Sequence, residues 1–164
     1  MSEHERRRPV GRVKEVTSLS NPLVKDIKAL ALKKFRDQNN AFMAEGLKLV
    51  IDALDLGWEI RTLIFAKAGR GNAAVEKVAA RTVAAGGDVL EVSEKVLSSI
   101  TRRDNPQMVV GVFTQRLVPL KDIRPASGDV WVALDRVRDP GNLGTVIRTV
   151  DAVGAKGVLL VGDT

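Results

Sequence analysis

Residues 138–154 read RDPGNLGTVIRTVDAVG and contain the side chains of this sequence that are best placed for chemistry. Asn142 offers amide donors and an acceptor, and Arg148 offers a guanidinium that suits a phosphate or ribose oxygen. A loop this rich in proline, glycine and asparagine forms either a ligand site or a tight turn. In the second interpretation Asn142 only caps a helix, and Arg148 only forms a surface ion pair with Asp151.

Two residue types that commonly carry catalysis are nearly missing from this sequence. It contains no cysteine, and its single histidine is His4. This composition excludes disulfides, thiolate zinc sites, cysteine nucleophiles and histidine-based acid–base pairs, and we expect no metal site. Any catalysis must rest on carboxylates, lysines, arginines, hydroxyls or backbone groups.

The motif lies between two apolar runs that predict a β–α–β unit. Residues 130–135 (VWVALD) predict a strand, residues 143–154 an amphipathic helix, and residues 157–162 (GVLLVG) a second strand. In α/β sheets, ligands bind beyond the carboxyl ends of the strands, which is where this loop would lie. A dinucleotide-binding enzyme fragment is a weaker alternative, because the G-x-G-x-x-G pattern is reduced to Gly141 and Gly144.

The rest of the chain predicts an α/β fold. Residues 18–40 predict one helix that is apolar on one side and basic on the other, and strands then alternate with helices. This alternation favours a parallel or mixed sheet with helices on both faces. One β–α–β unit cannot bury both faces of its sheet, so we expect the second domain to be incomplete in this chain. The predicted organisation is a disordered basic tail (1–13), a first domain (14–117), a linker (118–128) and the start of a second domain (129–164).

The charge of +6 is concentrated in the first forty residues, which hold ten lysines and arginines against five acids. Such a segment predicts a polyanionic partner, most simply a nucleic acid, although a solvated basic surface is the alternative. The candidate contact residues are Lys25, Lys28, Lys33, Arg36, Arg102 and Arg103. No apolar run approaches the roughly eighteen residues needed to cross a bilayer, so we expect a cytoplasmic protein with no membrane partner.

Several of these segments, in this order, resemble a known family. The first signature motif of the SpoU/TrmH class of RNA ribose 2′-O-methyltransferases, N-x-G-x-x-x-R followed by D-A-x-G, is similar to the segment that contains Asn142, Gly144, Arg148, Asp151, Ala152 and Gly154. The F-x-x-E-G segment of that family resembles the one formed by Phe42, Glu45 and Gly46. The segments SLSNPLVKDIKAL and NPQMVVGVF add two further similarities.

The resemblance implies a ribosomal-protein-like α/β/α domain that binds the RNA substrate over residues 14–117. Residues 129–164 would then begin a knotted α/β (SPOUT) methyltransferase domain. It further implies methyl transfer from S-adenosylmethionine to a ribose 2′-hydroxyl of RNA, by analogy ribosomal RNA, and a homodimer. The second and third motifs of the family enclose the cofactor and would follow Thr164, so the cofactor-binding residues are expected beyond this chain, which would be an inactive or partial fragment.

In this family Asn142 and Arg148 would be active-site residues of the first motif. A guanidinium stays protonated at ordinary pH, so we expect Arg148 to orient the ribose and phosphate and to stabilise charge on the oxygen. Asn142 would hold the loop and the ribose. A non-catalytic RNA-binding module of the ribosomal-protein type is the alternative function.

Overall fold

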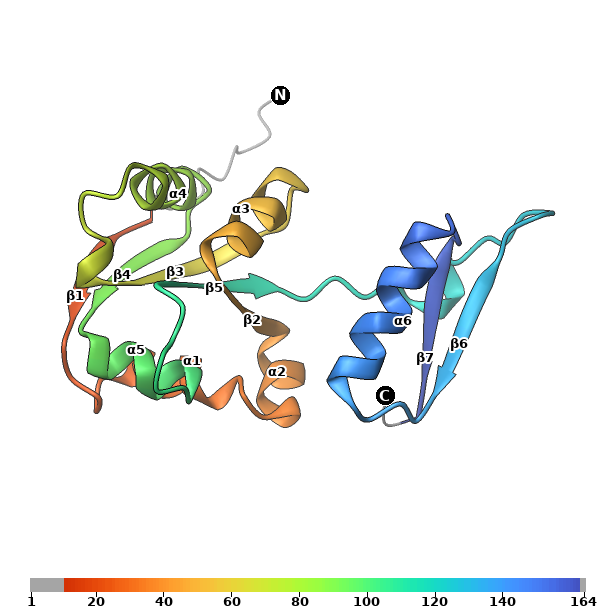
Figure 1. Ribbon diagram of the computed structural model, residues 1–164, viewed down its shortest axis with the longest axis horizontal. Helices are drawn as coiled ribbons and strands as arrows, with labels where there is room; N and C mark the ends of the chain where they lie inside the picture. Colours follow the sequence, from red (N-terminus) through yellow and green to blue (C-terminus); the bar gives the residue numbers. More distant parts are fainter. Residues whose placement is uncertain (1–10, 163–164) are drawn as a thin grey trace, which may run out of the picture. The chain divides into compact units, whose positions relative to one another are not determined.

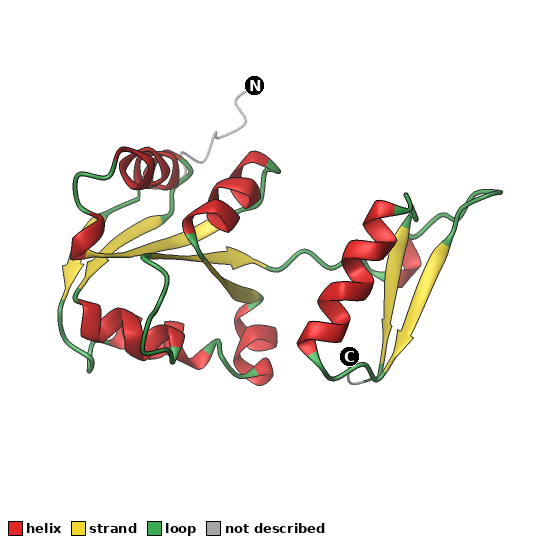
Figure 2. Cartoon of the chain, in the orientation of Figure 1, coloured by secondary structure: helices red, strands yellow, loops and turns green. Residues whose placement is uncertain are grey.

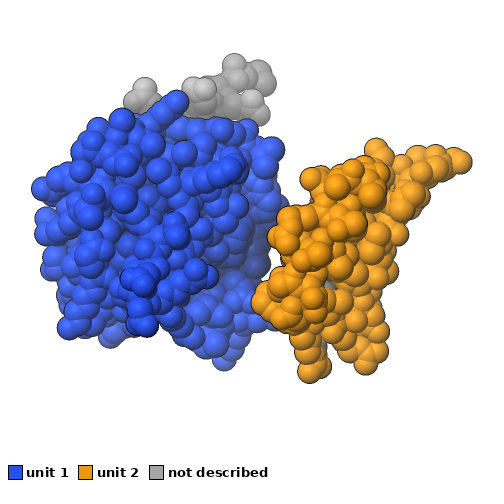
Figure 3. Space-filling model, viewed as in Figure 1, with its two compact units in different colours: residues 1–116 blue, residues 117–164 orange. Residues whose placement is uncertain are grey.

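The computed structural model describes residues 11–162, which divide into two compact units (Figure 3). The first unit ends at Arg116, and the second begins at Leu117. Residues 1–10 of the predicted tail lie outside the described residues. The prediction of a tail as far as residue 13 is wrong at its end, because strand β1 (Val13–Val16) begins there.

A mixed sheet forms the centre of the first unit, with the strand order β1-β4-β3-β5-β2 (Figure 1). Its other strands are β2 (Ala41–Glu45), β3 (Ile60–Ala66), β4 (Asp88–Val92) and β5 (Val109–Thr114). Strands β1, β4 and β3 are parallel, and β5 runs antiparallel to both of its neighbours. The α/β class and the mixed sheet predicted from the sequence are confirmed.

Helices cover both faces of this sheet (Figures 1 and 2). They are α1 (Pro22–Ala29), α2 (Lys33–Asn39), α3 (Leu47–Asp55), α4 (Ala73–Ala84) and α5 (Glu94–Thr101), with a short 3-10 helix, η1 (Lys67–Gly69). Successive side chains of a strand point to opposite faces, so Leu63 packs into the core under α3 and α4, and Ile64 into the core under α1 and α5. Two apolar layers therefore enclose one sheet.

The single helix predicted over residues 18–40 is wrong, because the chain breaks between α1 and α2. Asn21 caps α1 by accepting a hydrogen bond from the Leu23 backbone N–H at 2.9 Å. At the other end Leu32 is extended, with φ −98° and ψ 133°. Arg36 Nη1 donates to the carbonyls of Leu30 and Ala31 at 3.1 and 3.0 Å. The guanidinium thus satisfies carbonyls that a continuous helix would have satisfied itself.

Strand β1 was not predicted. Its sequence VKEV holds two charged residues, but it pairs in parallel with β4 from Val13↔Val89 to Val16↔Val92. Val16 is buried, while the charges form ion pairs with neighbouring elements: Lys14 with Asp88 at 2.8 Å, and Glu15 with Lys67. The charged side chains of this edge strand interrupt the apolar pattern. Their ion-pair partners are distant in the sequence, so no local signal indicates a strand.

The second unit is a β–α–β unit, as predicted. Strands β6 (Trp131–Asp135) and β7 (Gly157–Val161) pair in parallel, and α6 (Pro140–Ala152) connects them. Part of the predicted linker, 118–128, forms a 3-10 helix, η2 (Leu120–Asp122). A Cβ at position 157 would lie 2.6 Å from the ring of Trp131, its partner across the strand pair, so only glycine fits there.

Candidate functional site

The first turn of α6 is capped by Asp139. Its Oδ1 accepts a hydrogen bond from the Asn142 backbone N–H at 2.7 Å, and Pro140 occupies the first turn, where no N–H donor is needed. The interpretation of Asn142 as the helix cap is therefore wrong. Asn142 lies inside the helix and is exposed, and its side-chain amide has no hydrogen bond within residues 11–162. This leaves the amide available to a ligand.

Arg148 is exposed, and its guanidinium extends along the helix toward the N-terminus. Nη2 donates to Thr145 Oγ1 at 3.2 Å, and the Thr145 hydroxyl donates to the Gly141 carbonyl at 2.9 Å. A Cβ at Gly144 would lie 3.4 Å from Arg148 Nη1, so the missing side chain leaves the guanidinium room against the helix. Because residues three apart adjoin on a helix, Asn142, Thr145 and Arg148 form one exposed polar stripe.

The ion pair between Arg148 and Asp151 that the sequence offered as an alternative does not form. No carboxylate of residues 11–162 pairs with Arg148, and its one hydrogen-bond partner there is the neutral hydroxyl of Thr145. Side chains on a helix lean toward its N-terminus, which favours the partner three residues before Arg148 over the one three residues after it. Most donors of the guanidinium therefore remain available to a ligand.

A second charged group lies where β6 and β7 end. Arg136 follows β6 with a left-handed φ of 54°, and its guanidinium donates to both Asp135 oxygens at 2.9 Å. This hydrogen bonding raises the pKa of Arg136. A Cβ at Gly162 would come within 2.9 Å of Arg136 Cγ, so the glycine after β7 makes room for the arginine. This pair was not predicted from the sequence. It lies at the strand ends, where α/β sheets bind ligands.

The residues Phe42, Glu45 and Gly46 have structural partners. The Phe42 ring packs edge-on against Trp58, with centroids 5.5 Å apart. Glu45 Oε1 accepts from the Gln107 backbone N–H at 3.0 Å, and Oε2 lies 3.4 Å from Arg103 Nε. Gly46 has φ 114°, which a residue with a side chain rarely adopts. This segment therefore ties the loop before β5 to the junction of β2 and α3.

The six candidate RNA contacts belong to α1, α2 and the end of α5, and α1 and α5 pack against each other on one face of the sheet. Lys25, Lys33 and Arg102 are exposed, and Lys28 is half-buried. None of these four side chains has a hydrogen-bond or ion-pair partner among the described residues. Arg36 and Arg103 do have partners, the end of α1 and Glu45 respectively.

No helix between residues 11 and 162 is long and apolar enough to cross a membrane. The same part of the chain brings no three acidic or histidine side chains into an arrangement that could hold a metal ion.

Comparison with known families agrees with this architecture. Residues 21–111 match the MRM3-like substrate binding domain, and residues 129–164 match the SpoU rRNA Methylase family. The chain belongs to the family of the MRM3-like substrate binding domain. The second match contains the whole polar stripe of α6, and the first contains the F-x-x-E-G segment and the basic helices.

Several relatives of this chain are named as rRNA methyltransferases. The 23S rRNA (guanosine(2553)-2′-O)-methyltransferase RlmP of Bacillus subtilis is 32% identical over 92% of this chain and 55% of its own length. The structure of an rRNA methyltransferase from Sinorhizobium meliloti is 68% identical, with a TM-score of 0.84, over 94% of this chain and 57% of its own. The SpoU methyltransferase AviRb from Streptomyces viridochromogenes, in complex with AdoMet, is 25% identical with a TM-score of 0.76, over 88% and 54%. The chain thus spans about half the length of these relatives.

The dinucleotide-binding alternative is not supported. A dinucleotide site needs its first glycine in the tight turn between strand and helix, and its second where the backbone approaches the pyrophosphate. Gly141 and Gly144 instead lie within α6 itself. The missing side chain at Gly144 leaves room for the Arg148 guanidinium. The G-x-G-x-x-G pattern requires no such arginine.

Proposed function

We propose that this chain is part of an RNA ribose 2′-O-methyltransferase that uses S-adenosylmethionine and acts on ribosomal RNA. One observation carries the proposal: the Asn142 amide and most of the Arg148 donors are available on an exposed stripe of α6. Asp139, and not Asn142, caps the helix, and Arg148 donates only Nη2, to Thr145. The names of the relatives support the reaction and the class of RNA. In this proposal residues 14–117 bind the substrate, and residues 129–164 begin the catalytic domain.

Arg148 binds the ribose and its adjacent phosphate and stabilises negative charge that develops on the 2′-oxygen. A guanidinium has five N–H donors and loses its proton only at very high pH, so it serves as a donor and not as a base. As the O–C bond forms and the C–S bond of the sulfonium breaks, the 2′-hydroxyl proton passes to the adjacent phosphate of the RNA or to solvent. Arg148 Nη2 donates a hydrogen bond to Thr145 Oγ1. This bond orients the other donors of the guanidinium before RNA binds. Asn142, two turns nearer the start of α6, donates to or accepts from the ribose hydroxyls.

The described part of the second unit does not by itself fit S-adenosylmethionine. An adenosyl group needs a concave and largely apolar pocket. Residues 117–162 contain a single buried hydrophobic residue, Val150. We therefore propose that the cofactor is held by the half of the relatives that has no counterpart in these residues, where it would supply the methyl group.

The basic face of the first unit binds the phosphates of the RNA. Lys25, Lys28, Lys33 and Arg102 carry charges that no carboxylate of residues 11–162 neutralises, and they belong to elements of one face of the sheet. Affinity for RNA should fall steeply with salt, because each neutralised phosphate releases counterions. The resemblance to the family supports a homodimer in the cytoplasm as the working form.

The reaction is tested in a chimera that joins residues 1–164 to the remaining part of the Sinorhizobium meliloti methyltransferase, to which this chain is 68% identical. Methyl transfer to ribosomal RNA is measured with labelled S-adenosylmethionine, and resistance of the product to alkaline cleavage locates the methyl group on the 2′-oxygen. Arg148→Ala should lower kcat by about 100-fold, the scale of one lost charge-stabilising donor. Arg148→Lys should recover little, because an ammonium lacks the planar fork of donors.

Thr145 supplies the matched pair of variants. Thr145→Val removes the hydroxyl that positions Arg148 and should lower kcat by up to about tenfold, the scale of one hydrogen bond. Thr145→Ser keeps the hydroxyl and should retain activity. A folded chimera that binds S-adenosylmethionine but methylates no RNA refutes the proposed function. Wild-type turnover in Arg148→Lys refutes only the role given to the guanidinium.

A further inference from the structure

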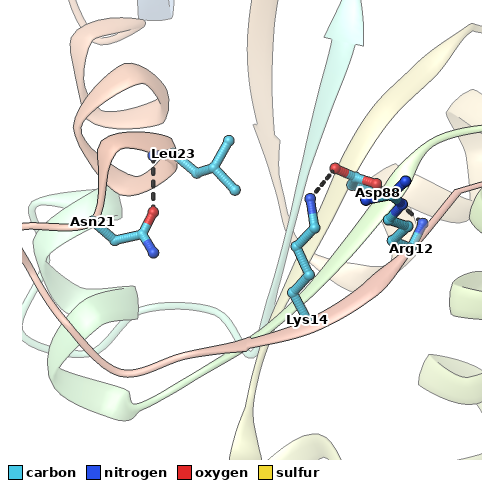
Figure 4. Close-up of polar contacts among 5 residues, drawn as sticks. All are labelled: Arg12, Lys14, Asn21, Leu23 and Asp88. Carbon is cyan, nitrogen blue, oxygen red and sulfur yellow. Dashed lines mark hydrogen bonds and ion pairs between the residues drawn. The ribbon is translucent and has the colours of Figure 1, made fainter.

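The first unit contains a cavity of 190 Å³ on the face of the sheet that α1 covers. Figure 4 shows Leu23 of α1 pointing toward the part of the sheet where Lys14 and Asp88 meet, and Leu23 and Asp88 both line the cavity. Drug-sized ligands occupy pockets of about 300 Å³ or more, so this cavity suits one small group. The cavity is lined by α1, the helix that contains Lys25 and Lys28, and it therefore belongs to the proposed RNA-binding face.

The floor of the cavity is apolar, and its rim is polar. The stripe of α1 that lines it contains Leu23, Asp26, Ile27 and, just after the helix, Leu30. These positions follow helical spacing, so an acid stands in a stripe that is otherwise apolar. On the sheet, Leu90, Val112 and Ala41 continue the floor, and Thr62 and Asp88, which are paired across β3 and β4, begin the rim.

The two cations near the rim are already engaged. Lys14 Nζ lies 2.8 Å from Asp88 Oδ2, and this hydrogen bond lowers the pKa of Asp88. Arg61 donates to the carbonyls of Asn39 and Asn40 at 2.7 and 3.1 Å, and to the Thr114 hydroxyl at 2.8 Å. Its guanidinium therefore ties the end of α2 to the sheet. Few cationic donors therefore remain for a phosphate. The negative charges of Asp26 and Asp88 nearly cancel the positive charges of these two cations.

Hydrogen-bond acceptors, in contrast, remain free. The Asp26 carboxylate has no partner within residues 11–162, and neither has the Thr62 hydroxyl. Asn39 donates its Nδ2 to the Phe35 carbonyl at 2.8 Å, which leaves its Oδ1 free to accept. A small, flat, neutral group that presents N–H donors matches both this rim and the apolar floor.

We propose that the cavity binds an unpaired nucleobase with an exocyclic amino group, from the RNA that the first unit holds. The inference rests on the proposed RNA binding and adds a base-specific contact to it. Proteins read single-stranded RNA by enclosing splayed-out bases between apolar side chains and hydrogen-bonding their edges. Lys25 and Lys28, which adjoin each other three residues apart on α1, contact neighbouring phosphates. Uracil lacks the amino group and should bind worse than cytosine or adenine.

The test measures the affinity of the 164-residue chain for fluorescent RNA octamers of cytidine, adenosine or uridine, and for a cytidine octamer with abasic positions. Asp26→Ala should weaken binding of the cytidine and adenosine octamers by about tenfold, the scale of a hydrogen bond to a charged group. For the uridine and abasic octamers it should leave binding unchanged or strengthen it, because it removes a negative charge. Lys25→Ala is the matched control and should weaken all four octamers alike.

Nuclear magnetic resonance locates the binding. Titration of the labelled chain with cytidine should shift the backbone amides of Asp26, Asn39, Thr62 and Asp88. If Asp26→Ala strengthens binding of every octamer equally, Asp26 acts only through its charge and the proposal is refuted. Shifts produced by arginine amide but not by nucleosides would assign the cavity to a basic side chain of a protein, and would also refute it. Failure to bind any RNA overturns the proposed function, and this inference with it.

Discussion

Gly46→Ala provides a direct test of how the segment formed by Phe42, Glu45 and Gly46 works. Gly46 has φ 114° and ψ 136°, and a Cβ added there would meet no atom within 4 Å. The cost of the substitution therefore comes from the backbone alone. An L-residue held in this region costs about 1–3 kcal/mol.

The backbone cannot avoid this cost by relaxing. The Gly46 N–H donates to the Val109 carbonyl at 2.8 Å, and the Gly46 carbonyl accepts from the Val50 N–H at 3.1 Å. A shift to negative φ would break these two bonds, each of which contributes about 0.5–1.5 kcal/mol. Whether the variant keeps the strained conformation or loses the two hydrogen bonds, its free energy of unfolding should fall by about 2 kcal/mol.

Urea unfolding measures this loss, with Trp58 fluorescence reporting on the first unit in a Trp131→Phe background. The matched control replaces Gly46 by D-alanine through chemical ligation, because a D-residue accepts positive φ without strain. The D-alanine protein should be at least as stable as the parent. A Gly46→Ala protein within about 0.5 kcal/mol of the parent, with an unchanged m-value, shows that the conformation of Gly46 is not required.

Two further predictions concern pH and helix capping. The hydrogen bond from Lys14 lowers the pKa of Asp88 below its ordinary 3.8, so the pair stabilises the fold above about pH 4 and is lost as the pH falls further. Asp88→Asn should cost at most about 1 kcal/mol at pH 7, because both side chains are one-third exposed, and the difference from wild type in urea unfolding should shrink toward pH 3. Asp139→Ala should speed hydrogen exchange in the first turn of α6 about fivefold, for a cap worth about 1 kcal/mol. Asn142→Ala should not, and the reverse result would restore Asn142 as the cap.

The sequence predicted most elements because their apolar periods were local and clear. It failed where a distant partner decided the outcome. Leu30, Ala31 and Leu32 continue a helical pattern, but the chain turns there because Leu30 packs on the sheet and Arg36 reaches back to the carbonyls. Neither contact can be read from helix propensity, which tertiary packing commonly overrides.

The candidate site residues were chosen by type and spacing, which did not predict their hydrogen-bond partners. Asp151 and Thr145 lie equally far from Arg148 along the chain, and only the lean of helical side chains toward the N-terminus favours Thr145. Asp139 and Asn142 are both good caps by type. Pro140 decides between them, because a proline in the first turn places the cap just before it.

The two units differ in how far their own residues account for their stability. In the first unit, two buried layers enclose the sheet, and the F-x-x-E-G segment and the cavity rest on that core. In the described part of the second unit, Val150 is the single buried hydrophobic residue, while Ile147, Val153 and Leu160 are exposed. The local geometry of the polar stripe follows from α6 itself, through one cap, one glycine and one threonine. In the proposed function, the positions of Asn142 and Arg148 relative to a ribose would therefore depend on contacts outside α6.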